Sequence, residues 1–231
     1  CYVTAYECEP AVVTFTESNL PSGTTWSVDF NGTTYSSSTS LISIGNLAQG
    51  TYSYSIPSVD GYNPYPSSGS VTISNSNENI NVVFKLPTTL TVGLSSANQY
   101  GDDITTYVSG SLSSKLGGVY GATVSITEDW YEYCYINTST QTVTLSYSGS
   151  NSASATTPSN GDYTATIHFY TTNNATSSAG GSGVNLDAQT CDGDTVYFFS
   201  SMTASYGGNS TYQASTASNS ASGKMAPSWS S

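Results

Sequence analysis

Three pairs of carboxylates lie close enough together in the sequence to suggest acid catalysis. They are Asp102-Asp103, Glu128-Asp129 and Asp192-Gly193-Asp194. An acid protease needs two carboxyl groups that share one site, so that one is protonated while the other is ionised. None of the three pairs lies in the Asp-Thr/Ser-Gly loop that such enzymes use, and solvated turns explain them more simply. The sequence therefore predicts no catalytic residue among them.

Two other stretches could carry chemistry of a different kind. The segment CDGDT at 191–195 offers oxygen ligands for calcium, but the rest of an EF-hand loop is missing. Lys85 could in principle form an isopeptide crosslink with an Asn or Asp, yet nothing selects a partner. A lysine at a strand end that discourages edge pairing is the simpler interpretation. We expect neither a metal nor a cofactor.

The single histidine, His168, lies in DYTATIHFY. Strict alternation places it on the face of a strand opposite to an apolar one, so we expect it to point into solvent. A catalytic histidine must be held beside a nucleophile by a third group, and no nucleophile-elbow motif is present. The apolar face of this strand is expected to carry Tyr163, Ala165, Ile167 and Phe169.

Charge is scarce and one-sided. Only 8% of the 231 residues are charged, the net charge is -12, and the only cations are Lys85, Lys115 and Lys224. Nucleic acids and anionic membranes need clustered cations to replace counterions, so neither is an expected partner, and we expect no membrane insertion of the mature chain. Carboxylates are protonated at a pH below their pKa of about 4, so a chain that relies on few ion pairs loses little stability in acid. The composition therefore suits an acidic habitat. A low-complexity surface protein fits equally well.

The hydrophobic pattern has a period of two almost everywhere, and no window of helical length has a period of 3.6. Strand-like segments include VVTFTE, TWSVDF, TYSYSI and NINVVF. The fold class expected is all-β, with immunoglobulin-like or pilin-like β-sandwich units completed by a donated strand. We divide the chain into an N-terminal tail, 1–10, a β-sandwich domain, 11–86, and a larger β-rich domain, 87–231, with a boundary at KLPTT.

The larger domain carries more aromatic residues and ends in a polar C-terminal segment. Within it, SGSNSASATTPSNG at 148–161 and NNATSSAGGSG at 173–183 read as long exposed loops. The composition of the C-terminal segment is typical of a mobile tail unless it packs on another copy or on its own domain. A single continuous β-rich domain is the alternative to this division.

The four cysteines follow no metal-site spacing, and disulfides are their expected use. They are Cys1, Cys8, Cys134 and Cys191. We pair Cys134 with Cys191, because both lie in strand-like segments. Cys1 and Cys8 would be roughly 23 Å apart in an extended chain, too far for one disulfide. Either the N-terminus folds back into a small loop, or one of these cysteines bonds elsewhere, including in another subunit.

Four sequons of the form Asn-x-Ser/Thr can carry N-linked glycans: Asn31, Asn137, Asn174 and Asn209. Together with the cysteines and a chain that begins at Cys1 without an initiator Met, they favour a processed, extracellular protein. Asn31-Gly32 between alternating apolar residues is also a strong β-hairpin signal. We therefore interpret Asn31 as both a turn residue and a sugar site.

Two stretches of the first domain carry a resemblance to a known group of proteins. VTFTESNLPSGTTWSVDFNGTTYSSS and GTYSYSIPSVDGYNPYPSSGSVTIS resemble a non-catalytic module repeated in secreted proteins of thermoacidophilic archaea, including regions attached to thermopsin-type acid proteases. It covers about the first third of the chain, and no active-site residue is shared. As a sequon-bearing, two-part β protein with a polar tail, the whole chain resembles the pilin subunits of the archaeal thread, a cell-surface filament.

This resemblance implies a glycosylated head-to-tail homopolymer in which one subunit donates a β-strand to the next. Head-to-tail contacts do not close, so they propagate a fibre. The first candidate donor is CYVTAYECEP, with Pro10 as its end. The C-terminal tail is the second, and a Cys1 to Cys8 loop would favour it. In the first candidate Val3 and Ala5 share one face, and the other face carries Tyr2, Thr4 and Tyr6.

The leading function is therefore a structural filament subunit that supports adhesion or biofilm formation, without enzymatic activity. One alternative is an S-layer-associated or carbohydrate-binding module with a platform of exposed aromatic residues. The tyrosines and Trp26, Trp130 and Trp229 could supply that platform, although we expect most of them in the core. The other alternative is a secreted acid hydrolase, whose carboxylates would have to converge in one cleft.

Overall fold

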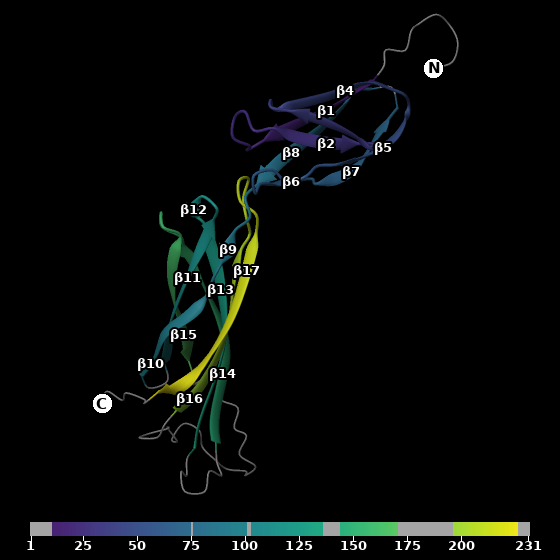
Figure 1. The fold of residues 1–231 in the computed structure, drawn as a ribbon. Coiled ribbons are helices and arrows are strands. Elements are labelled where there is room, and N and C mark those ends of the chain that lie inside the picture. The colour runs from purple at the N-terminus through teal and green to yellow at the C-terminus, as the bar shows by residue number, and fades with distance from the viewer. Residues whose placement is uncertain (1–10, 75, 101–102, 136–143, 171–195, 226–231) are drawn as a thin grey trace, which may run out of the picture. The chain divides into compact units, whose positions relative to one another are not determined.

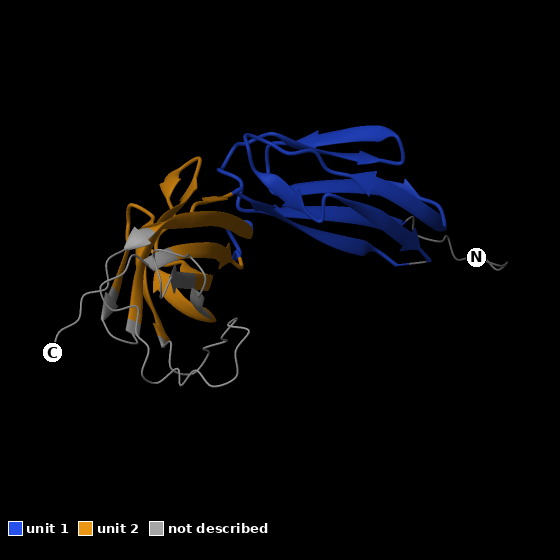
Figure 2. Cartoon of the chain, turned by 90° about the horizontal axis from the view of Figure 1, so that it is seen from below, with its two compact units in different colours: residues 1–87, 208–213 blue, residues 88–207, 214–231 orange. Residues whose placement is uncertain are grey.

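The computed structural model describes residues 11–74, 76–100, 103–135, 144–170 and 196–225. These residues form β-strands joined by turns, with no helix among them (Figure 1). The prediction of an all-β fold is confirmed. The chain forms two compact units, residues 1–87 with 208–213 and residues 88–207 with 214–231 (Figure 2).

Unit 1 contains two four-stranded sheets. One has the order β4-β1-β8-β6, with β1 parallel to β8. Its strands are β1 (Ala11–Ser18), β4 (Leu41–Leu47), β6 (Asn63–Tyr65) and β8 (Glu78–Lys85). The other has the order β3-β2-β5-β7. Its strands are β2 (Trp26–Phe30), β3 (Thr33–Ser37), β5 (Gly50–Ser55) and β7 (Ser68–Ile73).

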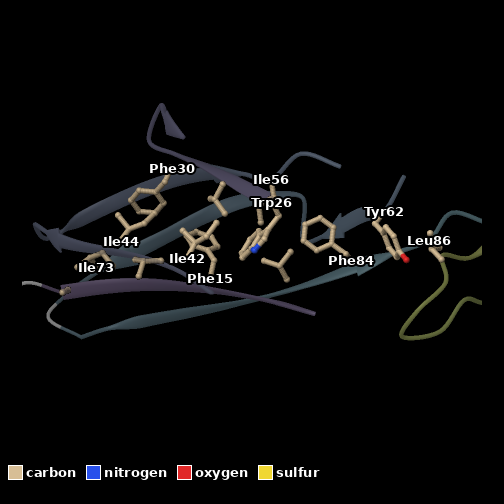
Figure 3. Packing of buried hydrophobic residues seen from close by; sticks show 14 residues of the cluster. Phe15, Trp26, Phe30, Ile42, Ile44, Ile56, Tyr62, Ile73, Phe84 and Leu86 are labelled. Atoms are coloured by element: carbon tan, nitrogen blue, oxygen red, sulfur yellow. The ribbon is translucent and has the colours of Figure 1, made fainter. Parts of the chain in front are cut away.

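The core of unit 1 is formed by the alternate residues of these strands. Phe15 and Phe84 are fully buried, and Trp26 is 1% exposed (Figure 3). Phe15 packs edge-to-face on Phe30 with ring centroids 6.1 Å apart, and Trp26 packs on Phe84 in the same way at 6.1 Å. The indole Nε1 of Trp26 donates a hydrogen bond of 2.7 Å to the carbonyl of Thr39. Period-two patterning thus becomes a continuous apolar layer.

The predicted hairpin at Asn31-Gly32 is present between β2 and β3. Phe30 pairs with Thr33, and the two turn residues have φ values of 50° and 82°. Positive φ at both positions is the conformation of a two-residue type I′ turn, which Asn-Gly adopts at low cost. Asn31 is exposed, as a sugar acceptor must be.

The loop that joins the last two strands of the chain belongs to unit 1. Leu86 donates its N–H to the carbonyl of Thr211 at 2.9 Å, and Gln213 donates to the carbonyl of Leu86 at 2.8 Å. The side-chain amide of Asn19 donates to the carbonyl of Ser210 at 2.6 Å. The sequence placed residues 208–213 in the second domain, whereas they are hydrogen-bonded into the first unit.

Unit 2 contains two larger sheets. The β13 sheet has the order β14-β13-β16-β17. Its strands are β13 (Thr123–Tyr135), β14 (Thr144–Thr156), β16 (Val196–Tyr206) and β17 (Ser215–Met225). In the β11 sheet, β11 (Asp103–Ser114) lies between β10 (Gly93–Tyr100) and β15 (Asp162–Tyr170). The short strands β9 (Thr89–Leu90) and β12 (Gly117–Gly118) pair with the end of β11.

One segment predicted to be a loop and part of the C-terminal segment form the edge strands of the β13 sheet. Residues 148–156 were expected in a loop, and they lie in β14, paired with β13 from Thr123–Thr156 to Tyr135–Thr144. Within the polar C-terminal segment, Ser215–Met225 form β17, which pairs with β16 along its whole length, so this part packs on its own domain. Over 148–156 and 216–223 Ser or Thr alternates with Ala, Asn and Gly, so the period of two is present there without large apolar residues.

Candidate functional site

One row of residues crosses the inner face of the β13 sheet from edge to edge. The strand registers place Asn151, Glu128, Met202 and Asn219 side by side. The three polar members of this row, Asn151, Glu128 and Asn219, are called the polar belt below. Each of them forms a hydrogen bond with unit 2 residues outside the β13 sheet.

Glu128 is the buried centre of the polar belt, with no exposed surface. Its Oε2 accepts a hydrogen bond of 2.5 Å from the hydroxyl of Thr106 on β11, and its Oε1 accepts one of 2.5 Å from the hydroxyl of Ser200 on β16. Buried carboxyl groups must be hydrogen-bonded to offset the loss of water. Glu128 meets this need with two hydroxyl donors.

Asn151 and Asn219 form equivalent clasps at the two edges of the sheet. The amide of Asn151 donates to the carbonyl of His168 on β15 at 2.6 Å, and that of Asn219 donates to the carbonyl of Val92 at 3.1 Å. Each Oδ1 accepts the N–H of the next residue, Ser152 at 2.9 Å and Ser220 at 2.8 Å. The same arrangement therefore fastens β14 to β15 and β17 to the link between β9 and β10.

The carboxylate pairs do not form a catalytic site in the described residues. Glu128 and Asp129 are neighbours on β13 and lie on opposite faces, so that one is buried and the other exposed. Asp102, Asp192 and Asp194 lie outside the described residues. No group of three His, Cys, Asp or Glu side chains gathers within the described ranges as a metal site would require. No helix there could cross a membrane.

His168 and Lys85 have the surroundings of structural residues. His168 lies on the exposed face of β15, as predicted, and its Nδ1 is 3.2 Å from the hydroxyl of Thr105. The buried face of the same strand carries Tyr163, Ile167 and Phe169. Lys85 places its ammonium 5.8 Å from the centre of the Tyr65 ring, a cation–π contact.

Tyr163 combines burial with a hydrogen bond in the interior of unit 2. Its hydroxyl donates to the carbonyl of Thr91 at 2.5 Å. Burial disfavours the phenolate and raises the pKa of Tyr163 to about 12.

The outer face of the β13 sheet, called the hydroxyl face, is made of exposed residues in four register rows. The rows are Ser154-Ser125-Ser205-Thr216, Ser152-Thr127-Thr203-Ser218, Ser150-Asp129-Ser201-Ser220 and Ser148-Tyr131-Phe199-Ser222. Apart from Asp129, Tyr131 and Phe199, every member is Ser or Thr. The rings of Tyr131 and Phe199 lie 6.3 Å apart at an angle of 34°, and these residues are 42% and 49% exposed.

The edge strands of the β11 sheet differ in how well their inner faces are covered. On β15 the inward residues Tyr163 and Ile167 are 3% and 2% exposed. On β10 the inward residues Leu94 and Ala97, opposite Val108 and Thr106, are only half-buried. Within the described residues β10 pairs with β11 alone. Of these two edge strands of the β11 sheet, β10 is therefore the less covered.

The predicted modification sites fall partly within the described residues. Asn31 and Asn209 are exposed in turns, and Oδ1 of Asn209 accepts the N–H groups of Thr211 and Tyr212 at 2.8 Å each. The backbone of Cys134 lies in β13, opposite Leu145. The other predicted sugar and disulfide residues, Asn137, Asn174, Cys1, Cys8 and Cys191, lie outside the described residues.

The predicted donor residues Tyr2, Val3, Thr4, Ala5 and Tyr6 also lie outside the described residues. Of the tryptophans considered for a sugar platform, Trp26 and Trp130 are 1% and 2% exposed and belong to the cores, while Trp229 is not described. The exposed aromatic pair Tyr131 and Phe199 was not singled out from the sequence. The signal available in the sequence is that Tyr131 and Phe199 occupy solvent-facing positions of strands in which most other solvent-facing residues are Ser or Thr.

Comparison with known proteins gives structural similarity only. No protein-family model matches the sequence, and no curated protein matches it. A DUF3823 family protein from Bacteroides ovatus superimposes with a TM-score of 0.27 at 12% identity, over 90% of this chain and 98% of that one. The full-length major pilin SpaD from Corynebacterium diphtheriae gives 0.30 at 10% identity, over 92% and 66%. The major pilin SpaA of the same species gives 0.25 at 6% identity, over 85% and 69%.

Proposed function

We propose that the chain is the structural subunit of an extracellular, glycosylated filament that assembles head-to-tail by donor strand complementation, like the archaeal thread subunits that it resembles. The observation that carries this proposal is that the two sheets of unit 2 differ in their number of long strands, which leaves one edge strand incompletely covered. Three long strands of the β11 sheet face four in the β13 sheet, and the edge strand β10 leaves Leu94 and Ala97 half-buried. A strand added beside β10 would satisfy its backbone groups and cover both side chains.

The N-terminal segment is the donor in this proposal. The C-terminal candidate, β17, already pairs with β16 of its own chain from Tyr206–Ser215 to Val196–Met225. Removing it would expose one side of β16 and break its ladder. The segment that ends at Pro10 precedes β1, and its inward face would place Val3 and Ala5 against Leu94 and Ala97 of the next subunit.

A structural role also agrees with the location of the acidic groups. An acid hydrolase would need two carboxylates in one cleft, and Glu128 and Asp129 lie on opposite faces of β13. Donated strands form heterologous contacts, which propagate without closing. The partners in this proposal are other copies of the chain, and the few charges on its surface leave solubility to hydroxyl groups and sugars.

Electron microscopy of the full chain, concentrated until it assembles, tests the proposal. Ala97→Lys should prevent filament formation, because a charge would lie in the face that the donor strand covers. Asn98→Lys is the matched control, since Asn98 is exposed on the other face of β10. On the donor, Ala5→Lys should prevent assembly and Thr4→Lys should not.

Thermal unfolding of each variant establishes that its subunit is folded. The proposal fails if Ala97→Lys and Ala5→Lys chains assemble as well as their controls, or if the unmodified chain remains monomeric under all conditions tested.

A further inference from the structure

The hydroxyl face offers a surface of one chemical character across all strands of the β13 sheet. Neighbouring strands lie about 4.8 Å apart, and residues of the same face recur about every 6.8 Å along a strand. Ser and Thr hydroxyls at these intervals each offer one donor and two acceptor positions. Such a surface can exchange hydrogen bonds in both directions with a partner that is itself rich in hydroxyl groups.

The charge of the hydroxyl face selects against ionic partners. Asp129 is the only charged residue in its four rows, and no cation is present in them. A polyanion would find no counterion there and would meet a chain of net charge -12. A polycation would find one carboxylate. The complementary partner is a neutral polymer.

The pair Tyr131 and Phe199 adds an apolar contact at one end of this surface. Burial of apolar surface is favourable, and Phe199 is 49% exposed beside another exposed ring, so a partner that covers both rings gains an apolar contact. Serines flank the pair on both sides, Ser148 on β14 and Ser222 on β17.

We propose that the hydroxyl face binds a neutral polysaccharide, with sugar rings stacked on Tyr131 and Phe199 and sugar hydroxyls bonded to the neighbouring Ser and Thr side chains. Sugars combine apolar C–H faces with hydroxyl edges, and aromatic rings beside small hydroxyl residues match both parts. Asp129, in the adjacent row, accepts hydrogen bonds from a sugar hydroxyl. The face belongs to a single chain, so binding does not depend on filament assembly.

The outer face of the β11 sheet supplies the matched control. Tyr107 is 41% exposed there, close to the 42% of Tyr131, but its register partner on β15 is Thr166 and not an aromatic residue. A single exposed tyrosine should not bind a sugar chain strongly. Replacing it removes a similar ring from the other sheet of the same unit.

Native gel electrophoresis of the monomeric full chain, in gels that contain hydroxyethyl cellulose, yeast mannan or glycogen, tests the proposal. At least one polymer should retard the unmodified chain and Tyr107→Ser equally. The double variant Tyr131→Ser and Phe199→Ser should bind about tenfold more weakly or not at all. Raising the salt concentration about tenfold should leave the retardation unchanged, because no ion pair is involved.

Thermal unfolding establishes that both variants are folded. The proposal is overturned if none of the three polymers retards the unmodified chain, or if the double variant is retarded like Tyr107→Ser. It is also overturned if the pair proves to cover another copy of the chain, which sedimentation would reveal as a dimer that the double variant loses. A chain that forms filaments and fails this test keeps the proposed function and loses only this binding site.

Discussion

Unit 1 joins its two sheets through apolar side chains, whereas unit 2 adds a row of hydrogen bonds between its sheets. The core cluster of unit 1 consists of buried apolar and aromatic residues. The buried polar residues of the described chain, Thr105, Thr106, Glu128, Thr157 and Ser200, all lie in unit 2. Both are β-sandwiches of similar strand pattern, so the difference lies in what the inward positions carry.

The polar belt compensates for the small side chains of the edge strands. Ala153 and Ala155 on β14, and Ala217 and Ala221 on β17, bury little apolar surface and would fit equally well after a shift of two residues. Hydrogen bonds from Asn151 and Asn219 exist only in one register. Polar contacts between the sheets can therefore fix a register that packing leaves open.

The largest effect is expected from a cavity in the apolar core of unit 1. Phe15→Ala removes a fully buried ring between Phe30 and Tyr54 and should lower the free energy of unfolding by about 3–5 kcal/mol. Val12→Ala, on the less buried face of β1, is the control and should cost about 1 kcal/mol. Urea unfolding followed by tryptophan fluorescence measures both. Equal losses would mean that packing does not dominate unit 1.

The centre of the polar belt should be nearly as sensitive. Glu128→Ala removes the carboxylate that accepts from the hydroxyls of Thr106 and Ser200 and opens a cavity, so we expect a loss of about 3 kcal/mol. Glu128→Gln keeps an acceptor oxygen and the side-chain volume, and should cost about 1 kcal/mol. Chemical unfolding of the two variants distinguishes hydrogen bonding from shape. If both cost the same, the belt contributes nothing through its acceptors.

The two buried tryptophans provide a direct comparison between the units. Nε1 of Trp26 donates to Thr39, whereas Nε1 of Trp130 has no hydrogen-bond partner among the described residues. Replacing each by Phe removes similar volume, but only Trp26→Phe breaks a hydrogen bond. We expect Trp26→Phe to cost about 1–2 kcal/mol more than Trp130→Phe. Thermal unfolding of the two variants measures this difference, and a reversed order would contradict it.

Loss of an edge clasp should lower the free energy of unfolding less than loss of Glu128 does, and its main effect should be faster local opening of the edge strand. Asn219→Ala removes the hydrogen bond to Val92 and should cost about 1 kcal/mol. Amide hydrogen exchange along β17 should accelerate, because the middle of the strand then loses its side-chain hydrogen bond to Val92. Ser218→Ala, on the exposed face of the same strand, is the control. Unchanged protection of β17 in Asn219→Ala would show that the clasp does not hold the strand.

Much of this fold could be predicted from the period of two in the sequence. The Asn31-Gly32 hairpin, the division near Pro87 and the exposed position of His168 all follow from local patterns. Residues 149–156 of β14 were missed because Ala and Gly at their inward positions resemble loop composition, and the sequence left open whether the C-terminal segment packs on its own domain or on another copy. The regular alternation of Ser with small residues in these segments was the signal that would have indicated strands.

The polar belt could not be predicted from the sequence. Its members come from β14, β13 and β17, and only the pairing of strands distant in sequence places them in one row. The same is true of the pair Tyr131 and Phe199, whose strands are joined through a long stretch of chain. Local periodicity gives the face of each residue, and strand pairing gives its neighbours.

The smallest effect at neutral pH is expected for Tyr163, and it should grow with pH. Tyr163→Phe removes the hydrogen bond to Thr91 and should cost about 1 kcal/mol at neutral pH. The pKa of Tyr163 is about 12 in the folded chain and about 10 in the unfolded one, so its contribution is complete below pH 10 and is lost as the pH rises through 12. The difference in the free energy of unfolding between the two proteins should therefore close or reverse between pH 10 and 12.

Urea unfolding at a series of alkaline pH values measures this difference, with Tyr120→Phe, at an exposed position, as the control. A difference that stays constant up to pH 12 would mean that Tyr163 ionises as easily in the folded chain as in the unfolded one.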